Sequence, residues 1–138
     1  MSKHVKYYKQ VNAHSQTMDA DPHRLIELLL SGAMGKIFIA KGCMERQDIA
    51  GKGINISLAI TIIDSLRASL NLEEGGDIAN NLNDLYEYML KRLLQANMDN
   101  NLLYLDEVNS LLGTIHSGWT GIREEAISII QPEQGTKQ

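Results

Sequence analysis

Four histidines and one cysteine are the side chains of this sequence that could most readily bind a metal or carry a transferred group. The histidines are His4, His14, His23 and His116, and no two of them have the i, i+4 spacing that places two metal ligands on one helix face. No glutamate is followed by a histidine three residues later, as di-metal helical bundles require. The pattern predicts no metal site and no cofactor, and it favours histidines that lie on the surface.

The other signatures of catalysis are equally weak. Cys43 has no second cysteine with which to form an internal disulfide, which suits a reducing compartment. No serine sits in a Gly-x-Ser-x-Gly elbow, and the segment Gly51-Lys52-Gly53 is too short to be a phosphate loop. Acidic residues gather at expected helix ends, where carboxylates stabilise helix N-termini. We therefore expect a protein that is not an enzyme.

One alternative with group-transfer chemistry is a histidine phosphotransfer domain, which is also a four-helix bundle of this length. Such a domain needs an exposed histidine on a helix, with a lysine and a small residue nearby. His23 is followed by Arg24 but lies in the first turn of an expected helix. His116 is followed by Ser117 and Gly118 but has no lysine close in sequence. We keep this function as the alternative to a binding role.

Length and charge narrow the choice of partners. The chain has 138 residues, which suits one domain, and a net charge of -4 from 13 basic and 17 acidic residues. Because the basic residues form no cluster, we expect no nucleic-acid partner. No signal peptide is visible, and the unbroken apolar runs fall far short of the roughly 20 residues that span a bilayer. We expect a cytoplasmic protein that does not insert into membranes.

Apolar spacing of three and four residues predicts four long helices. Asp21, Asp48 and Asp77 are expected to cap the first three, with Pro22 in the first helical position and a turn over 73–76. The fourth helix should carry an apolar stripe from Leu102 to Ile122, extended to Ile127. Short connections favour antiparallel neighbours. The predicted fold is all-α, an antiparallel up-down four-helix bundle with a short extra N-terminal helix.

Three segments are expected along the chain. Residues 1–20 form an N-terminal arm with a short amphipathic helix, residues 21–130 form the bundle, and residues 131–138 form a disordered tail. The first two long helices hold more apolar residues than one stripe needs. The excess consists of Leu28, Leu30, Met34, Phe38, Ile39, Ile54, Leu58 and Ile62. Either these helices are wholly buried, or they line an external groove for a partner.

The order of motifs resembles the flagellin-specific export chaperones, the FliS-type proteins. Residues 8–11 (Tyr-Lys-Gln-Val) are similar to the tyrosine segment of that family, and residues 21–26 to the start of its first long helix. The most specific stretch is Gly75-Gly76-Asp77-Ile78-Ala79-Asn80-Asn81-Leu82, continued by Leu85-Tyr86-Glu87-Tyr88-Met89. The resemblance covers residues 8 to 122. One departure is Leu30, where the family commonly has tyrosine, which removes any role of that tyrosine here.

The resemblance implies a function and its partners. Such chaperones bind the C-terminal segment of flagellin in the cytoplasm, prevent premature polymerisation, and help deliver it to components of the flagellar type III export gate. Their own N-terminal segment can occupy a groove when flagellin is absent. The oligomeric state is left open, with a homodimer possible.

From the resemblance and the apolar pattern together, we expect eight residues to take part in binding. Tyr8 and Val11 belong to the covering arm. The residues in or beside the groove are Ile56, Ile60, Ile63, Leu82, Tyr86 and Met89. Some of these six must belong to the core, and the sequence does not separate the two groups.

Overall fold

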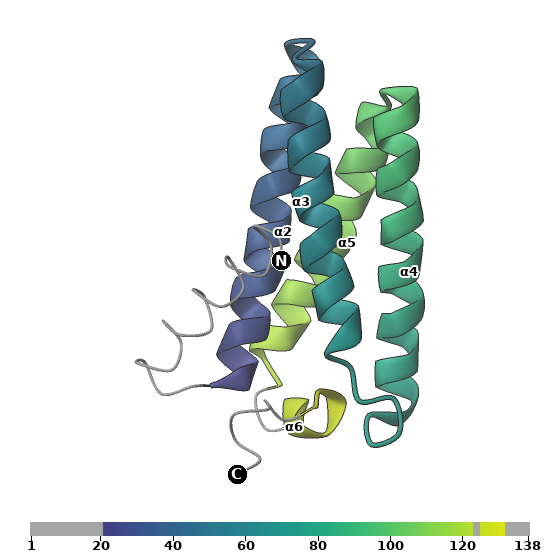
Figure 1. The fold of residues 1–138 in the computed structure, drawn as a ribbon. Coiled ribbons are helices and arrows are strands. Elements are labelled where there is room, and N and C mark those ends of the chain that lie inside the picture. Colours follow the sequence, from purple (N-terminus) through teal and green to yellow (C-terminus); the bar gives the residue numbers. More distant parts are fainter. Residues whose placement is uncertain (1–20, 123–124, 132–138) are drawn as a thin grey trace, which may run out of the picture.

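The computed structural model describes residues 21–122 and 125–131, so the expected N-terminal arm and its short helix lie outside it. Four long helices make up most of the described chain, as predicted (Figure 1). They are α2 (Pro22–Glu45), α3 (Ile49–Ala68), α4 (Gly76–Asp99) and α5 (Leu102–Thr120), and a short helix α6 (Ala126–Ile129) follows.

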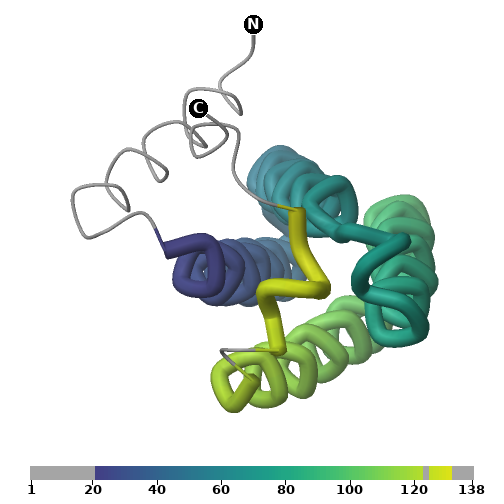
Figure 2. The backbone as a smooth tube through the Cα atoms, turned by 90° about the horizontal axis from the view of Figure 1, so that it is seen from below, coloured from purple at the N-terminus to yellow at the C-terminus, as the bar shows by residue number. Residues whose placement is uncertain are grey.

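The long helices run alternately up and down and form a closed ring (Figures 1 and 2). Each packs on two neighbours, in the order α2, α3, α4, α5 and back to α2. Helix α3 therefore lies diagonally opposite α5. The antiparallel bundle predicted from the short connections is confirmed.

Side-chain caps start the first two helices where the sequence predicts them. The Asp21 carboxylate accepts a hydrogen bond of 3.1 Å from the His23 amide, and Pro22 occupies the first helical position. The Asp48 carboxylate accepts one of 3.0 Å from the Gly51 amide. These bonds satisfy amides that have no partner within the helix.

The start of α4 differs from the prediction. Its N-cap is Gly75, which makes no side-chain capping bond, and Asp77 lies in the first turn instead of at the cap. The chain reverses through Gly76, whose φ of +56° suits glycine. A Cβ on Gly75 would lie 2.5 Å from the Cβ of Ala79 and 3.1 Å from the Cα of Ile129, so this turn is pressed against α6.

The core is filled by the apolar stripes, with four corrections. Ile49 and Ile78 were expected in the stripes but are exposed, because each lies in the first turn of its helix at an end of the bundle. Leu30 and Ile62 were expected outside the stripes but are buried. Helices α2 and α3, which carry Leu30 and Ile62, thus each bury a wider face than one narrow apolar stripe.

The chain does not continue as one helix to Ile127, because α5 ends at Thr120 and α6 crosses the lower end of the bundle (Figure 2). Ala126, Ile129 and Ile130 are buried there, whereas Ile127 is exposed. The Asn71 amide donates to the Ile129 carbonyl at 2.8 Å. The Gln131 amide donates to the Ser69 carbonyl at 2.9 Å, so this residue of the predicted tail is held in place. The rest of the tail lies outside the described residues.

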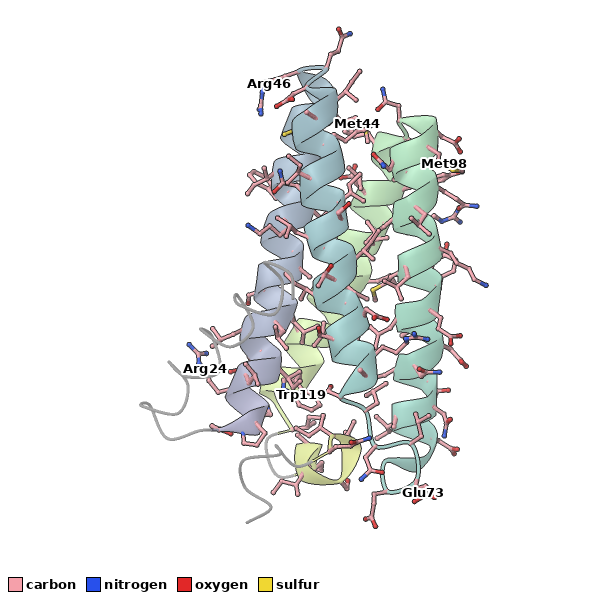
Figure 3. The ribbon with its side chains drawn as sticks, in the orientation of Figure 1. Arg24, Met44, Arg46, Glu73, Met98 and Trp119 are labelled. Atoms are coloured by element: carbon pink, nitrogen blue, oxygen red, sulfur yellow. The ribbon has the colours of Figure 1, made fainter. Side chains whose placement is uncertain are left out.

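Near that lower end, one aromatic side chain of α2 and one of α5 join these two helices. The ring nitrogen Nε2 of His23 donates to the carbonyl of Trp119 at 2.7 Å, and Nε1 of Trp119 donates to the carbonyl of His23 at 3.0 Å. The two rings are stacked, with their centroids 5.1 Å apart. We call this pair the His23–Trp119 latch, and Figure 3 labels Trp119 at its position on α5.

Candidate partner-binding surface

Both histidines of the described chain, His23 and His116, take part in hydrogen bonds. His23 is only 7% exposed, contrary to the expected surface position, and its Nε2 is bonded within the latch. The Nε2 atom of His116 shares a hydrogen bond of 3.2 Å with the hydroxyl of Ser31. Within residues 21–122 and 125–131, no group of three His, Cys, Asp or Glu side chains could hold a metal ion. A buried His23 does not meet the requirement of a phosphotransfer histidine.

The structure separates the predicted binding residues into two groups. Tyr8 and Val11 lie outside the described residues. The four that are buried in the core are Ile56, Ile63, Tyr86 and Met89. Ile60 and Leu82 are partly exposed and pack against that core. In this closed bundle a partner can reach only the second group, and a role of either group in binding stays a prediction.

Helix α3 is an apolar helix that leaves part of its apolar side chains uncovered, among them Ile49 and Ile54. It is long and apolar enough, by length and composition alone, to cross a membrane, yet only 33% of its most apolar window is buried. The core helix of a soluble protein passes the same test of composition, but such a helix is mostly buried. Ser, Thr, Asn and Gly interrupt the apolar residues of α3, so no unbroken apolar run marks this helix in the sequence. The exposed apolar side chains of α3 form a candidate surface for a partner.

Toward α4, an ion pair shows which rows of side chains face each other. Arg67 donates to Glu87 at 3.0 Å across the two helices. Ile60 lies seven residues before Arg67, and Leu94 lies seven residues after Glu87. Seven residues are close to two turns, and the helices are antiparallel, so both side chains lie about 10 Å from the ion pair at the same height. Leu94 is 55% exposed.

Toward α2, the close approach of Gly51 and Cys43 shows which residues of α2 and α3 lie at the same height. A Cβ on Gly51 would lie 2.8 Å from Sγ of Cys43, so these residues face each other. Ile39 lies four residues before Cys43, while Ile54 and Leu58 lie three and seven residues after Gly51. Helix geometry therefore places Ile39 at a height between Ile54 and Leu58. Ile54 is 60% exposed and Ile39 is 46% exposed.

These five apolar residues define what we call the α3 face: Ile39, Ile54, Leu58, Ile60 and Leu94. Two polar side chains near it are bonded back to the helix: Thr61 donates its hydroxyl proton to the Ser57 carbonyl, and Asn55 donates to the Gly51 carbonyl. The charges at its lower end, Asp64 and Arg67, are paired with each other at 3.1 Å. A docking chain would therefore meet few polar groups that still need water.

Polar contacts bridge the seams on either side of α5. Lys41 of α2 pairs with Asp106 at 2.8 Å, and this hydrogen bond raises the pKa of Lys41 above its ordinary value. On the other seam, Arg92 of α4 pairs with Glu107 at 3.0 Å. Tyr88 donates to the same carboxylate at 2.6 Å, and the guanidinium of Arg92 stacks over Tyr104. The bundle thus has an apolar side around α3 and a polar side around α5.

Comparison with known proteins identifies a family whose members are similar to this chain. A family model described as flagellar protein FliS matches residues 4–126. The flagellar secretion chaperone FliSB of Pseudomonas aeruginosa is 50% identical over 120 residues, covering 87% of this chain and 95% of the relative. The flagellar secretion chaperone FliS of Salmonella typhimurium is 45% identical over 123 residues, covering 88% and 91%. The Bacillus subtilis protein of the same name is 30% identical over 100 residues, covering 72% and 74%.

Proposed function

The chain belongs to the family of the flagellar protein FliS, and from this premise we propose that it is a cytoplasmic export chaperone that binds the C-terminal segment of flagellin. It keeps the segment from polymerising before export and helps deliver it to the flagellar export gate. This role needs a surface for a chain that is unfolded beforehand, and it needs no catalytic group.

The observation that carries the proposal is the apolar helix α3, of whose most apolar window only a third is buried. A disordered segment loses conformational entropy when it binds, so it must bury a large apolar area in return. The α3 face offers such area on three adjacent helices, beside polar groups that are already bonded. The side around α5 offers mainly charged and hydroxyl groups, which gain little by leaving water.

The N-terminal arm has a part in this proposal. Its last residue joins α2 at Asp21, at the end of the bundle where α6 also lies. From the family resemblance we infer that Tyr8 and Val11 cover part of the apolar surface until flagellin displaces them. Removing residues 1–12 should then raise the affinity for flagellin, because the protein no longer has to release its own arm.

A calorimetric titration with a peptide of the flagellin C-terminal segment tests the proposal. Binding should show a negative heat-capacity change, since apolar surface leaves water. Ile54→Asp should weaken binding by about tenfold or more, because burying one isoleucine side chain contributes about 1.5–3 kcal/mol. Leu103→Asp is the matched control, since Leu103 is 71% exposed and belongs to α5, on the polar side.

Two results would count against the proposal. A peptide that gives no heat with the intact chain would remove the chaperone function. Equal losses from Ile54→Asp and Leu103→Asp would keep a flagellin-binding protein but move its binding surface away from the α3 face. Circular dichroism of each variant is the control that tests whether the bundle is still folded.

A further inference from the structure

The methionines of the described chain differ sharply in their access to solvent. Met44 and Met89 are buried, and Met34 is partly buried against the core. Met98 is 76% exposed. Figure 3 shows it on the outer side of α4, near the upper end of the bundle.

Met98 also adjoins the surface that we propose for flagellin. It lies four residues after Leu94, and side chains with this spacing are neighbours on a helix. The same turn of α4 is tied to α3, because the ammonium group of Lys52 donates to the carbonyl of Asn97 at 3.1 Å and to the side-chain oxygen of Asn100 at 2.8 Å. Met98 therefore extends the α3 face at its rim, on a turn that is held in place.

We propose that Met98 is a peroxide-sensitive modification site, and that its oxidation weakens partner binding at the α3 face. The second half rests on the proposed function. The thioether sulfur attacks one oxygen of hydrogen peroxide, so that an S–O bond forms, the O–O bond breaks, and the second oxygen leaves as water. Sulfur loses two electrons and peroxide gains them. The product is methionine sulfoxide, which dedicated reductases can reverse.

The sulfoxide changes the chemistry of the rim. An apolar, adaptable side chain becomes a strongly polar one, and a partner that covers it must remove its hydration. The expected loss of affinity is about fivefold, at the lower end of the cost of burying an unpaired polar group, because the site is a rim position. Reduction of the sulfoxide restores the original surface, which would make the effect reversible.

The first experiment treats the folded full-length chain with dilute hydrogen peroxide and follows each methionine by peptide mass. Among the four methionines of the described chain, Met98 should gain one oxygen first, Met34 more slowly, and Met44 and Met89 last, in the order of their exposure. Equal rates for Met98 and Met89 would overturn the assignment of the site. This result does not depend on any partner.

The second experiment adds a flagellin C-terminal peptide that contains no methionine. After peroxide has been removed, the oxidised chain should bind about fivefold more weakly than the untreated chain. Met98→Leu, a substitution of similar volume, is compared with itself, and its affinity after the treatment should equal its affinity before it. Bound peptide should also slow the oxidation of Met98 but not of Met34.

The possible failures are distinguishable. If the untreated chain does not bind the peptide, the proposed function is wrong, and this is seen before any oxidation. If untreated and oxidised chains bind equally, flagellin binding stands and the regulatory inference is wrong. If Met98→Leu loses affinity after oxidation as the natural chain does, another residue is responsible.

Discussion

The His23–Trp119 latch leads to a prediction whose size can be worked out from its contacts. His23→Ala removes the Nε2 donor and leaves the buried Trp119 carbonyl without its 2.7 Å hydrogen bond. The carbonyl keeps a 3.2 Å hydrogen bond from the Ile122 amide, so losing the bond to His23 costs about 0.5–1.5 kcal/mol. Loss of the stacked ring adds about 0.5–1.5 kcal/mol. The reverse bond, from Nε1 of Trp119 to the His23 carbonyl, involves only backbone of residue 23 and can persist. We expect a loss of about 2 kcal/mol in the free energy of unfolding.

Urea unfolding measures this loss. With a slope of about 2 kcal/mol per molar for a small domain, the midpoint should fall by about 1 M. Helical circular dichroism reports the whole bundle, while fluorescence of Trp119, the single tryptophan of the chain, reports the latch. His116→Ala is the matched control, because it removes one hydrogen bond of 3.2 Å at an exposed site. Its cost should stay below about 1 kcal/mol.

The reasoning is refuted if His23→Ala lies within about 0.5 kcal/mol of the natural chain, since a solvated carbonyl would then have replaced the bond at no cost. It is also refuted if His116→Ala is equally damaging. If the urea midpoint followed by Trp119 fluorescence falls while the midpoint followed by helical circular dichroism is unchanged, the latch holds only the last turn of α5.

Two further predictions concern other buried groups. Lys52→Met should lower the free energy of unfolding by about 1–2 kcal/mol, because the carbonyl of Asn97 loses its donor and the end of α4 loses a positive charge. Lys91→Met, on the exposed side of α4, is the control and should change this free energy little. Urea unfolding compares the two variants. Burial raises the pKa of Tyr86 far above its ordinary value, so the unfolded chain releases this proton first and stability should fall as the pH rises above about 10. Tyr86→Phe should make that decline less steep, and an unchanged slope would exclude Tyr86 as its source.

The helix starts were predictable wherever the local sequence decides them. Asp21 and Asp48 cap α2 and α3 because their carboxylates reach amides two and three residues later, a contact that needs no distant partner. Asp77 has the same chemistry but does not cap α4. The glycine pair before it and the nearby α6 backbone decide that turn, and α6 comes from far along the chain.

Core and surface were harder to separate. Ile60 and Ile63 differ by less than one helical turn, and both fit an apolar stripe, yet Ile63 is buried and Ile60 is partly exposed. The difference depends on how α3 is rotated toward its two neighbours, which contacts such as Arg67 with Glu87 reveal. His23 was likewise expected on the surface, because Trp119, which covers it, lies 96 residues away. The end of α5 was missed because apolar spacing continues past the bend at Gly121.

Of the four seams between neighbouring long helices, one differs from the others, and this affects how the protein folds and unfolds. Three of the four pairings of long helices join elements that follow each other along the chain, and such local contacts form quickly. The pairing of α2 with α5 joins the first and last long helices, so it closes a long loop and carries the largest entropic cost. We expect this seam to be closed late in folding and to part early in unfolding. Weakening it would then shorten the lifetime of the native state while leaving the folding rate almost unchanged.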